Sequence, residues 1–74
     1  MKDKEILKEI GNNIRAERNR KGLSQEKLAE LTGISYGQVI GTIERGEINT
    51  SILFIIKIMK ILNIDFEKIY SFKN

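Results

Sequence analysis

Apolar residues recur every three or four positions through most of this chain, and this spacing constrains the fold more than any other feature. Ile6, Ile10 and Ile14 follow one another at intervals of four residues. They form one apolar stripe on a helix that we expect from about residue 3 to residue 20. No segment alternates apolar and polar residues long enough to form a convincing strand. The pattern therefore predicts an all-α fold class.

Glycines and capping side chains divide the rest of the chain into further helices. Gly22, Gly33 and Gly46 each follow a helical segment, as expected of glycine just past a helix end. Residues whose side chains cap helix N-termini precede four further expected helices, at about 25–32, 36–45, from residue 51 or 52 to about 62, and 66–71. These capping candidates are Ser24, Ser35, Thr50 or Ser51, and Asp65. The prediction is five helices with short connections.

Length and composition exclude several classes of protein. The 74 residues are enough for one domain, expected to span residues 1–74, and such a small domain buries only about 60% of its unfolded surface. Because the chain has no cysteine and no histidine, neither disulfides nor the usual zinc sites can add stability, so we expect no metal and no cofactor. Oligomerisation is the remaining common route. No recognisable acid–base pair or phosphate loop is present, so an enzyme is not expected.

The net charge bears on the binding partners of the protein, and the N-terminal residues bear on its location in the cell. The net charge of +3 is weak evidence by itself, and the basic cluster is compatible with either a solvated helix face or nucleic-acid binding. That cluster comprises Arg15, Arg18, Arg20 and Lys21. Charged residues follow Met1 where a signal peptide would be apolar, and the longest apolar runs are too short to span a membrane. We therefore expect a soluble cytoplasmic protein that does not bind membranes.

Two short helices joined by a glycine turn, at about residues 24–45, form the pattern of a helix-turn-helix. Flanking residues extend this pattern in a characteristic order: Ile14-Arg15 with Arg18, Gly22 to Ala29, Thr32 to Ser35, Ile43 to Gly46, Asn49 to Ser51, and Leu62 to Ile64. From Ile10 to Tyr70 the chain resembles the phage-repressor and Cro-type helix-turn-helix (XRE) family. The resemblance implies a five-helix, lambda-repressor-like DNA-binding domain. It also implies a small transcriptional regulator that binds specific double-stranded sites, and we expect a repressor acting as a dimer on a two-fold site.

The resemblance implies roles for four residues around the first turn. Ser24 and Gln25 open the second helix, where free N–H groups and the positive end of the helix dipole attract a phosphate. In the family, the residue at Gln25 donates to the DNA backbone and braces the recognition helix. The family also has a buried ion pair, which Arg18 and Glu44 match, and such a pair defines geometry more than it adds stability. The alternatives are that Ser24 is only a cap, that Gln25 is solvated, and that both charges lie at the surface.

The third helix departs from the family in length. The family usually places seven residues between the capping serine and the glutamate, whereas eight, Tyr36 to Ile43, lie there in this chain. One additional residue rotates everything after it by about 100° in a regular helix. Either the turn is one residue longer, or a π-bulge near Gly41 takes up the residue. We favour the longer turn, which makes Ile40 and Ile43 the buried pair.

Several side chains are candidates for direct DNA contact. Ser35, Tyr36, Gln38 and Thr42 are the candidates for base edges: Gln38 can bond to adenine in bidentate fashion, and Thr42 can contact a thymine methyl. Arg45 and Asn49 follow the helix and are better placed for phosphates, unless they are simply solvated loop residues. Gly37 and Gly41 either expose backbone to the DNA or allow a close helix approach.

The fourth expected helix carries more apolar residues than one buried face requires. Leu53, Phe54 and Ile61 fall where the family is usually polar or small, and an exposed apolar patch of this kind usually marks an interface. We interpret it as a homodimer interface, unless aromatic residues near the C-terminus fold back over it. Those residues are Phe66, Tyr70 and Phe72. The alternative function is a helical interaction module, such as an antitoxin-like protein whose partner binds this surface.

Overall fold

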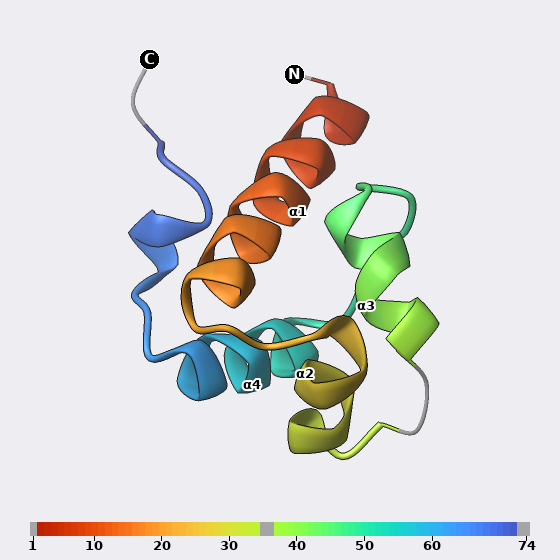
Figure 1. Ribbon diagram of the computed structural model, residues 1–74. Coiled ribbons are helices and arrows are strands. Elements are labelled where there is room, and N and C mark those ends of the chain that lie inside the picture. Colours follow the sequence, from red (N-terminus) through yellow and green to blue (C-terminus); the bar gives the residue numbers. More distant parts are fainter. Residues whose placement is uncertain (1, 35–36, 73–74) are drawn as a thin grey trace.

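Helix α1 (Asp3–Arg20) passes between α3 and the C-terminal segment, as the ribbon of the computed structural model shows (Figure 1). The structure describes residues 2–34 and 37–72. The other elements are α2 (Gln25–Thr32), α3 (Gly37–Glu44), α4 (Ile52–Leu62) and the short 3-10 turn η1 (Phe66–Lys68). The described part of the chain contains no strand, so the predicted all-α class is confirmed. The expected fifth helix is reduced to the three-residue turn η1, so the count of five helices is slightly wrong.

Among the described residues, serine side chains cap the N-termini of two helices. The Ser24 hydroxyl accepts a hydrogen bond from the Lys27 N–H at 2.9 Å, and the Ser51 hydroxyl accepts one from the Phe54 N–H at 3.1 Å. Each bond satisfies a backbone donor that the first turn of a helix leaves free. Ser51 rather than Thr50 therefore caps α4. Asp65 makes no such side-chain bond before η1.

Three helices end with the same arrangement of a left-handed residue followed by an apolar one. The pairs are Gly22-Leu23 after α1, Gly33-Ile34 after α2 and Asn63-Ile64 after α4. In each pair the apolar residue's N–H donates to a carbonyl five residues earlier, which defines a Schellman motif. All three apolar side chains pack against the core. The packing of these side chains against the core holds the C-terminal ends of the three helices in place.

The core draws residues from every helix and from the C-terminal segment. Its fully buried apolar side chains are Ile14, Leu28, Ile40, Ile58, Leu62 and Ile69. The C-terminal segment is joined to α1 by a hydrogen bond of 2.9 Å from the Asn13 amide to the Ile69 carbonyl. In the described part of the chain, no helix combines the length and the apolar character needed to cross a membrane.

Gly11 marks the point where α1 crosses the end of α3. A β-carbon at this position would lie 2.5 Å from the Glu44 carbonyl oxygen and still nearer to that of Ile43. Side chains are excluded at such distances, so only glycine allows the two backbones to approach this closely. The close approach places the last turn of α3 directly against α1.

The apolar residues of α4 that are buried and those that are exposed differ from the ones expected from the sequence. Phe54, expected on an outer face, is 9% exposed and belongs to the core. Leu53 is 69% exposed and its neighbour Ile52 is 65% exposed, while Ile61 is half-buried. The aromatic residues near the C-terminus stack on one another, with 5.8 Å between the ring centroids of Phe66 and Phe72. They leave Leu53 exposed.

Candidate nucleic-acid interface

The carboxylate of Glu44, the last residue of α3, is completely buried. Arg18 of α1 binds it with two parallel hydrogen bonds, from Nε to Oε2 at 2.6 Å and from Nη2 to Oε1 at 3.1 Å. The third guanidinium nitrogen, Nη1, donates to the Leu23 carbonyl at 2.7 Å. The structure thus brings the expected pair together in the bidentate geometry typical of arginine and carboxylate.

Two further donors reach the same carboxylate. Gln25 donates from Nε2 to Oε1 of Glu44 at 3.1 Å, and Arg15 lies 3.5 Å from that oxygen through its Nε. Gln25 therefore links the first turn of α2 to the last residue of α3, which is the bracing that the resemblance implies. Arg15 was not expected in this network, although it lies three residues before Arg18 and hence on the same face of α1. We call these residues the Glu44 network: Arg15, Arg18, Gln25 and Glu44.

Helix α3 is a regular α-helix, although the segment between Ser35 and Glu44 is one residue longer than is usual in the family. The segment from Gly37 to Glu44 is α-helical throughout, with Ile40 fully buried and Ile43 4% exposed. No π-type turn lies within it, which supports the longer turn over a bulge near Gly41. Ser35 and Tyr36 lie outside the described residues.

The two glycines of α3 lie against the first turn of α2. A β-carbon at Gly37 would be 3.2 Å from the Glu26 α-carbon, and one at Gly41 would be 3.4 Å from Oε1 of Gln25. These positions favour close helix approach over exposure of backbone to a ligand. The amide of Gln25 consequently lies against Gly41 of α3, beside the Glu44 carboxylate.

The remaining side chains proposed for base contact differ in their surroundings. Gln38 is exposed on α3 and takes no part in the Glu44 network. Thr42 is half-buried, and its hydroxyl donates to the Val39 carbonyl at 2.8 Å, which leaves its methyl group for apolar contact. Asn49 is exposed in the loop between α3 and α4.

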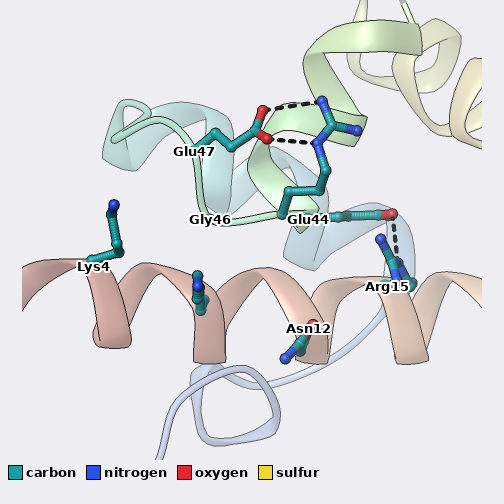
Figure 2. Close-up of a pocket in the computed structure, with 8 residues that line it drawn as sticks. Lys4, Asn12, Arg15, Glu44, Gly46 and Glu47 are labelled. Carbon is teal, nitrogen blue, oxygen red and sulfur yellow. Dashed lines mark hydrogen bonds and ion pairs between the residues drawn. The ribbon is translucent and has the colours of Figure 1, made fainter.

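Arg45 forms an ion pair that the sequence analysis missed. Its Nε and Nη2 donate to the two carboxylate oxygens of Glu47, at 2.9 and 3.1 Å, and both side chains are about half exposed (Figure 2). Hydrogen bonding to Arg45, reinforced by its charge, holds the pKa of Glu47 below its ordinary value. The same contacts with Glu47 raise the pKa of Arg45. The sequence does contain a signal for this pair, because residues of opposite charge, Arg45 and Glu47, flank Gly46.

Gly46 gives the pair its geometry. Its φ of +71° lets the chain reverse, and the Glu47 N–H donates to the Thr42 carbonyl at 3.0 Å. This is the Schellman arrangement of the other helix ends, but a charged residue follows the glycine in place of an apolar one. The carboxylate of Glu47 therefore remains at the surface, where it binds Arg45.

Residues 14–69 match the helix-turn-helix family. Control protein C.SmaI of Serratia marcescens is 42% identical over 66 residues, which cover 89% of this chain and 74% of that protein. The chain belongs to the XRE-type helix-turn-helix family. This helix-turn-helix protein is a DNA-binding regulator of transcription, and membership of this family points to regulation rather than to an enzyme.

Solved structures agree with this assignment. The restriction-modification controller protein C.AhdI from Aeromonas hydrophila superposes with a TM-score of 0.79 and 38% sequence identity, over 86% of this chain and 96% of that one. The clp gene regulator ClgR from C. glutamicum has the same TM-score at 22% identity, over 86% of this chain and 81% of that one. At that identity, ClgR supports the fold alone.

Proposed function

We propose that this helix-turn-helix protein binds a specific two-fold DNA site as a homodimer and represses transcription from it. The observation that carries the proposal is the Glu44 network. It joins α3 to α1 and α2 through buried, charge-assisted bonds, while Gln38 on α3 remains exposed. A helix held in this way can enter the major groove without changing its orientation.

Side chains at the two ends of the motif and side chains on α3 have different roles in this proposal. Ser24 and Gln25, at the start of α2, and Arg45 and Asn49, after α3, contact phosphates, which orient the protein without selecting a sequence. Base selection comes from Gln38 through adenine and from the Thr42 methyl through thymine. Ser35 and Tyr36, outside the described residues, are further candidates for base contact.

Dimerisation is proposed from the outer face of α4. Ile52, Leu53 and Ile56 are all exposed there, and half-buried Ile61 lies further along the same helix. A contiguous apolar patch on the surface of a small domain often marks an interaction site. Two copies joined through this face would present two α3 helices to the DNA. A two-fold site requires these helices to lie about 34–36 Å apart.

The relatives suggest which genes are regulated. C.SmaI is named a control protein and C.AhdI a restriction-modification controller protein. Because the chain covers most of both relatives, we propose that it controls a restriction-modification operon.

Selection of bound duplexes from a random pool tests the proposal directly. We expect an enriched sequence with two-fold symmetry and an affinity that falls as salt rises. Gln38→Ala should relax the preference at one position of each half-site by about 1–3 kcal/mol. Repression should follow in a reporter carrying the selected site.

The interaction-module alternative makes the opposite prediction. An antitoxin-like protein that acts only through a partner on α4 would enrich no sequence and would bind duplex with no salt-dependent component. Absence of duplex binding at 50 mM salt would overturn the proposed function.

A further inference from the structure

A shallow groove separates the first half of α1 from the loop that follows α3 (Figure 2). Its volume is about 590 Å³. Polar and charged side chains line both walls: Lys4, Lys8, Asn12 and Arg15 from α1, with Arg45 and Glu47 opposite. Such a lining suits a charged ligand rather than an apolar one.

The groove has an excess of positive charge, because its two acidic residues are already paired. Glu44 is bound by Arg18, and Glu47 is bound by Arg45. In residues 2–34 and 37–72, neither Lys4 nor Lys8 forms an ion pair. These two ammonium groups are therefore available to an anion.

Three cationic residues of α1 lie in one row along the groove. Lys4, Lys8 and Arg15 recur at helical intervals, with Asn12 between the last two. The row is roughly 16 Å long at the 1.5 Å rise of a helix. Phosphates of one DNA strand succeed one another about every 3.4 Å along the duplex axis. The row is thus long enough to meet several phosphates.

The wall opposite this row is fixed in place. A β-carbon at Gly46 would lie 2.8 Å from the α-carbon of Lys8, so the loop rests directly on the α1 backbone. The loop also meets the Lys8 side chain, whose Cγ would lie 2.7 Å from that β-carbon. A ligand consequently meets a preformed surface.

We propose that this groove holds phosphate groups of the DNA backbone, so that the DNA contact extends along α1 to Lys8 and Lys4. The inference rests on the proposed function, because the groove is continuous with that interface. Arg15 and Glu44 belong both to the groove and to the network that includes Gln25. A free polyphosphate has the same chemistry, so the test includes both sources.

The first arm measures salt dependence on the selected duplex with Lys4→Gln, Lys8→Gln and the double variant. Each lost phosphate contact should reduce the slope of log K against log salt by about 0.9, which is about eightfold weaker binding at 0.1 M salt. The loss should be equal on unrelated duplexes, because phosphates carry no sequence information. Slopes and affinities equal to those of the control would overturn the inference.

Lys68→Gln is the matched control, because Lys68 is an exposed lysine of η1, in the C-terminal segment bonded to α1 through Asn13. It removes the same charge outside the groove and should change affinity less than twofold. Circular dichroism melting of each variant establishes that the fold is retained. If the unmodified protein binds no duplex, the proposed function and the inference both fail; if it binds and the lysine variants bind equally well, only the inference fails.

The second arm adds sodium tripolyphosphate to the free protein and follows the lysine side chains by NMR. Saturable shifts at Lys4 and Lys8, combined with an unchanged duplex slope in the variants, would assign the groove to free anions and overturn the DNA assignment. Lysine shifts on addition of duplex, together with the reduced slopes, support it.

Discussion

Glu44 is a carboxylate without solvent contact, and its charge is balanced by donors from two other helices. Burial of a charge costs several kcal/mol unless partners with good geometry surround it. Here the partners are 26 and 19 residues away in sequence. The orientation of α3 therefore depends on single side chains of α1 and α2.

Removal of one partner should show how strongly the fold depends on this pair. Arg18→Ala leaves Glu44 buried without its main partner, so we expect a loss of roughly 3–5 kcal/mol in the free energy of unfolding. Chemical denaturation of both single variants and of the Arg18→Ala/Glu44→Ala double variant gives the coupling energy. Coupling near zero would mean that the pair does not hold α3.

Glu47 should weaken DNA binding in the unmodified protein. Its carboxylate occupies the fork of Arg45, and its charge repels any phosphate that approaches. Glu47→Gln should therefore bind the selected duplex several-fold more tightly, measured by fluorescence anisotropy at fixed salt. Glu67→Gln in η1, an exposed site with the same charge change, is the control and should bind as the unmodified protein does.

The same pair predicts a pH dependence with a definite sign. The pKa of Glu47 is lowered in the folded protein, so the pair is intact at neutral pH and is lost as pH falls through that lowered value. Arg45→Gln should return the pKa of Glu47 towards its ordinary value, as an NMR titration of the carboxyl carbon can measure. An unchanged pKa would contradict the ion pair in solution.

At the level of elements, the crossing of α1 and α3 depends on a glycine within a helix. Glycine there costs about 1 kcal/mol relative to alanine when the helix is considered alone. In the folded protein, the same position lies against the Glu44 carbonyl oxygen. The tertiary contact therefore reverses the preference that helix propensity predicts.

Gly11→Ala should lower stability by about 1–3 kcal/mol, because the new methyl group forces the two backbones apart. That loss corresponds to a melting temperature lower by at least about 4 °C for a domain of this size. Gly41→Ala is the matched comparison, since its methyl would meet flexible side chains at 3.2 Å or more. A melting temperature unchanged in Gly11→Ala would refute the close crossing.

Apolar periodicity and capping residues predicted the first two helices well. Helix α1 spans the residues of its apolar stripe, and α2 begins after Ser24 and ends before Gly33, as expected. These signals failed for α4, where nine of eleven residues are apolar and periodicity cannot identify the buried side. Phe54 was placed outside for that reason. The short segment after Asp65 is too short for a stable α-helix and forms one 3-10 turn. The Arg45–Glu47 pair depends on the backbone turn at Gly46, which composition alone does not describe.

At the scale of the whole molecule, a small core coexists with uncovered apolar surface. Nine apolar residues are buried in the part of the chain that the structure describes, whereas Ile52 and Leu53 are mostly exposed on α4. A small domain has little stability of its own, and association that covers such surface adds to it. We therefore expect stability to rise with protein concentration.

Leu53→Lys should convert the proposed dimer into a monomer by placing a charge in the apolar contact. Sedimentation equilibrium should then give half the mass of the unmodified protein at micromolar concentration, and operator binding should weaken. Phe72→Lys, an exposed apolar site outside α4, is the control and should remain dimeric. An unmodified protein that sediments as a monomer would exclude this interface.

The Glu44 network has a consequence for how such proteins acquire new targets. Gln38 is exposed and supplies none of the bonds that hold α3, so its replacement should leave folding almost unaffected. Mutations that change the preferred operator can therefore accumulate without a compensating change in the scaffold. Because the exposed residues of α3 are distinct from those that hold the helix in place, α3 is a convenient site for engineering. Libraries at its exposed positions should alter DNA preference while the buried Glu44 carboxylate keeps the helix in the same position.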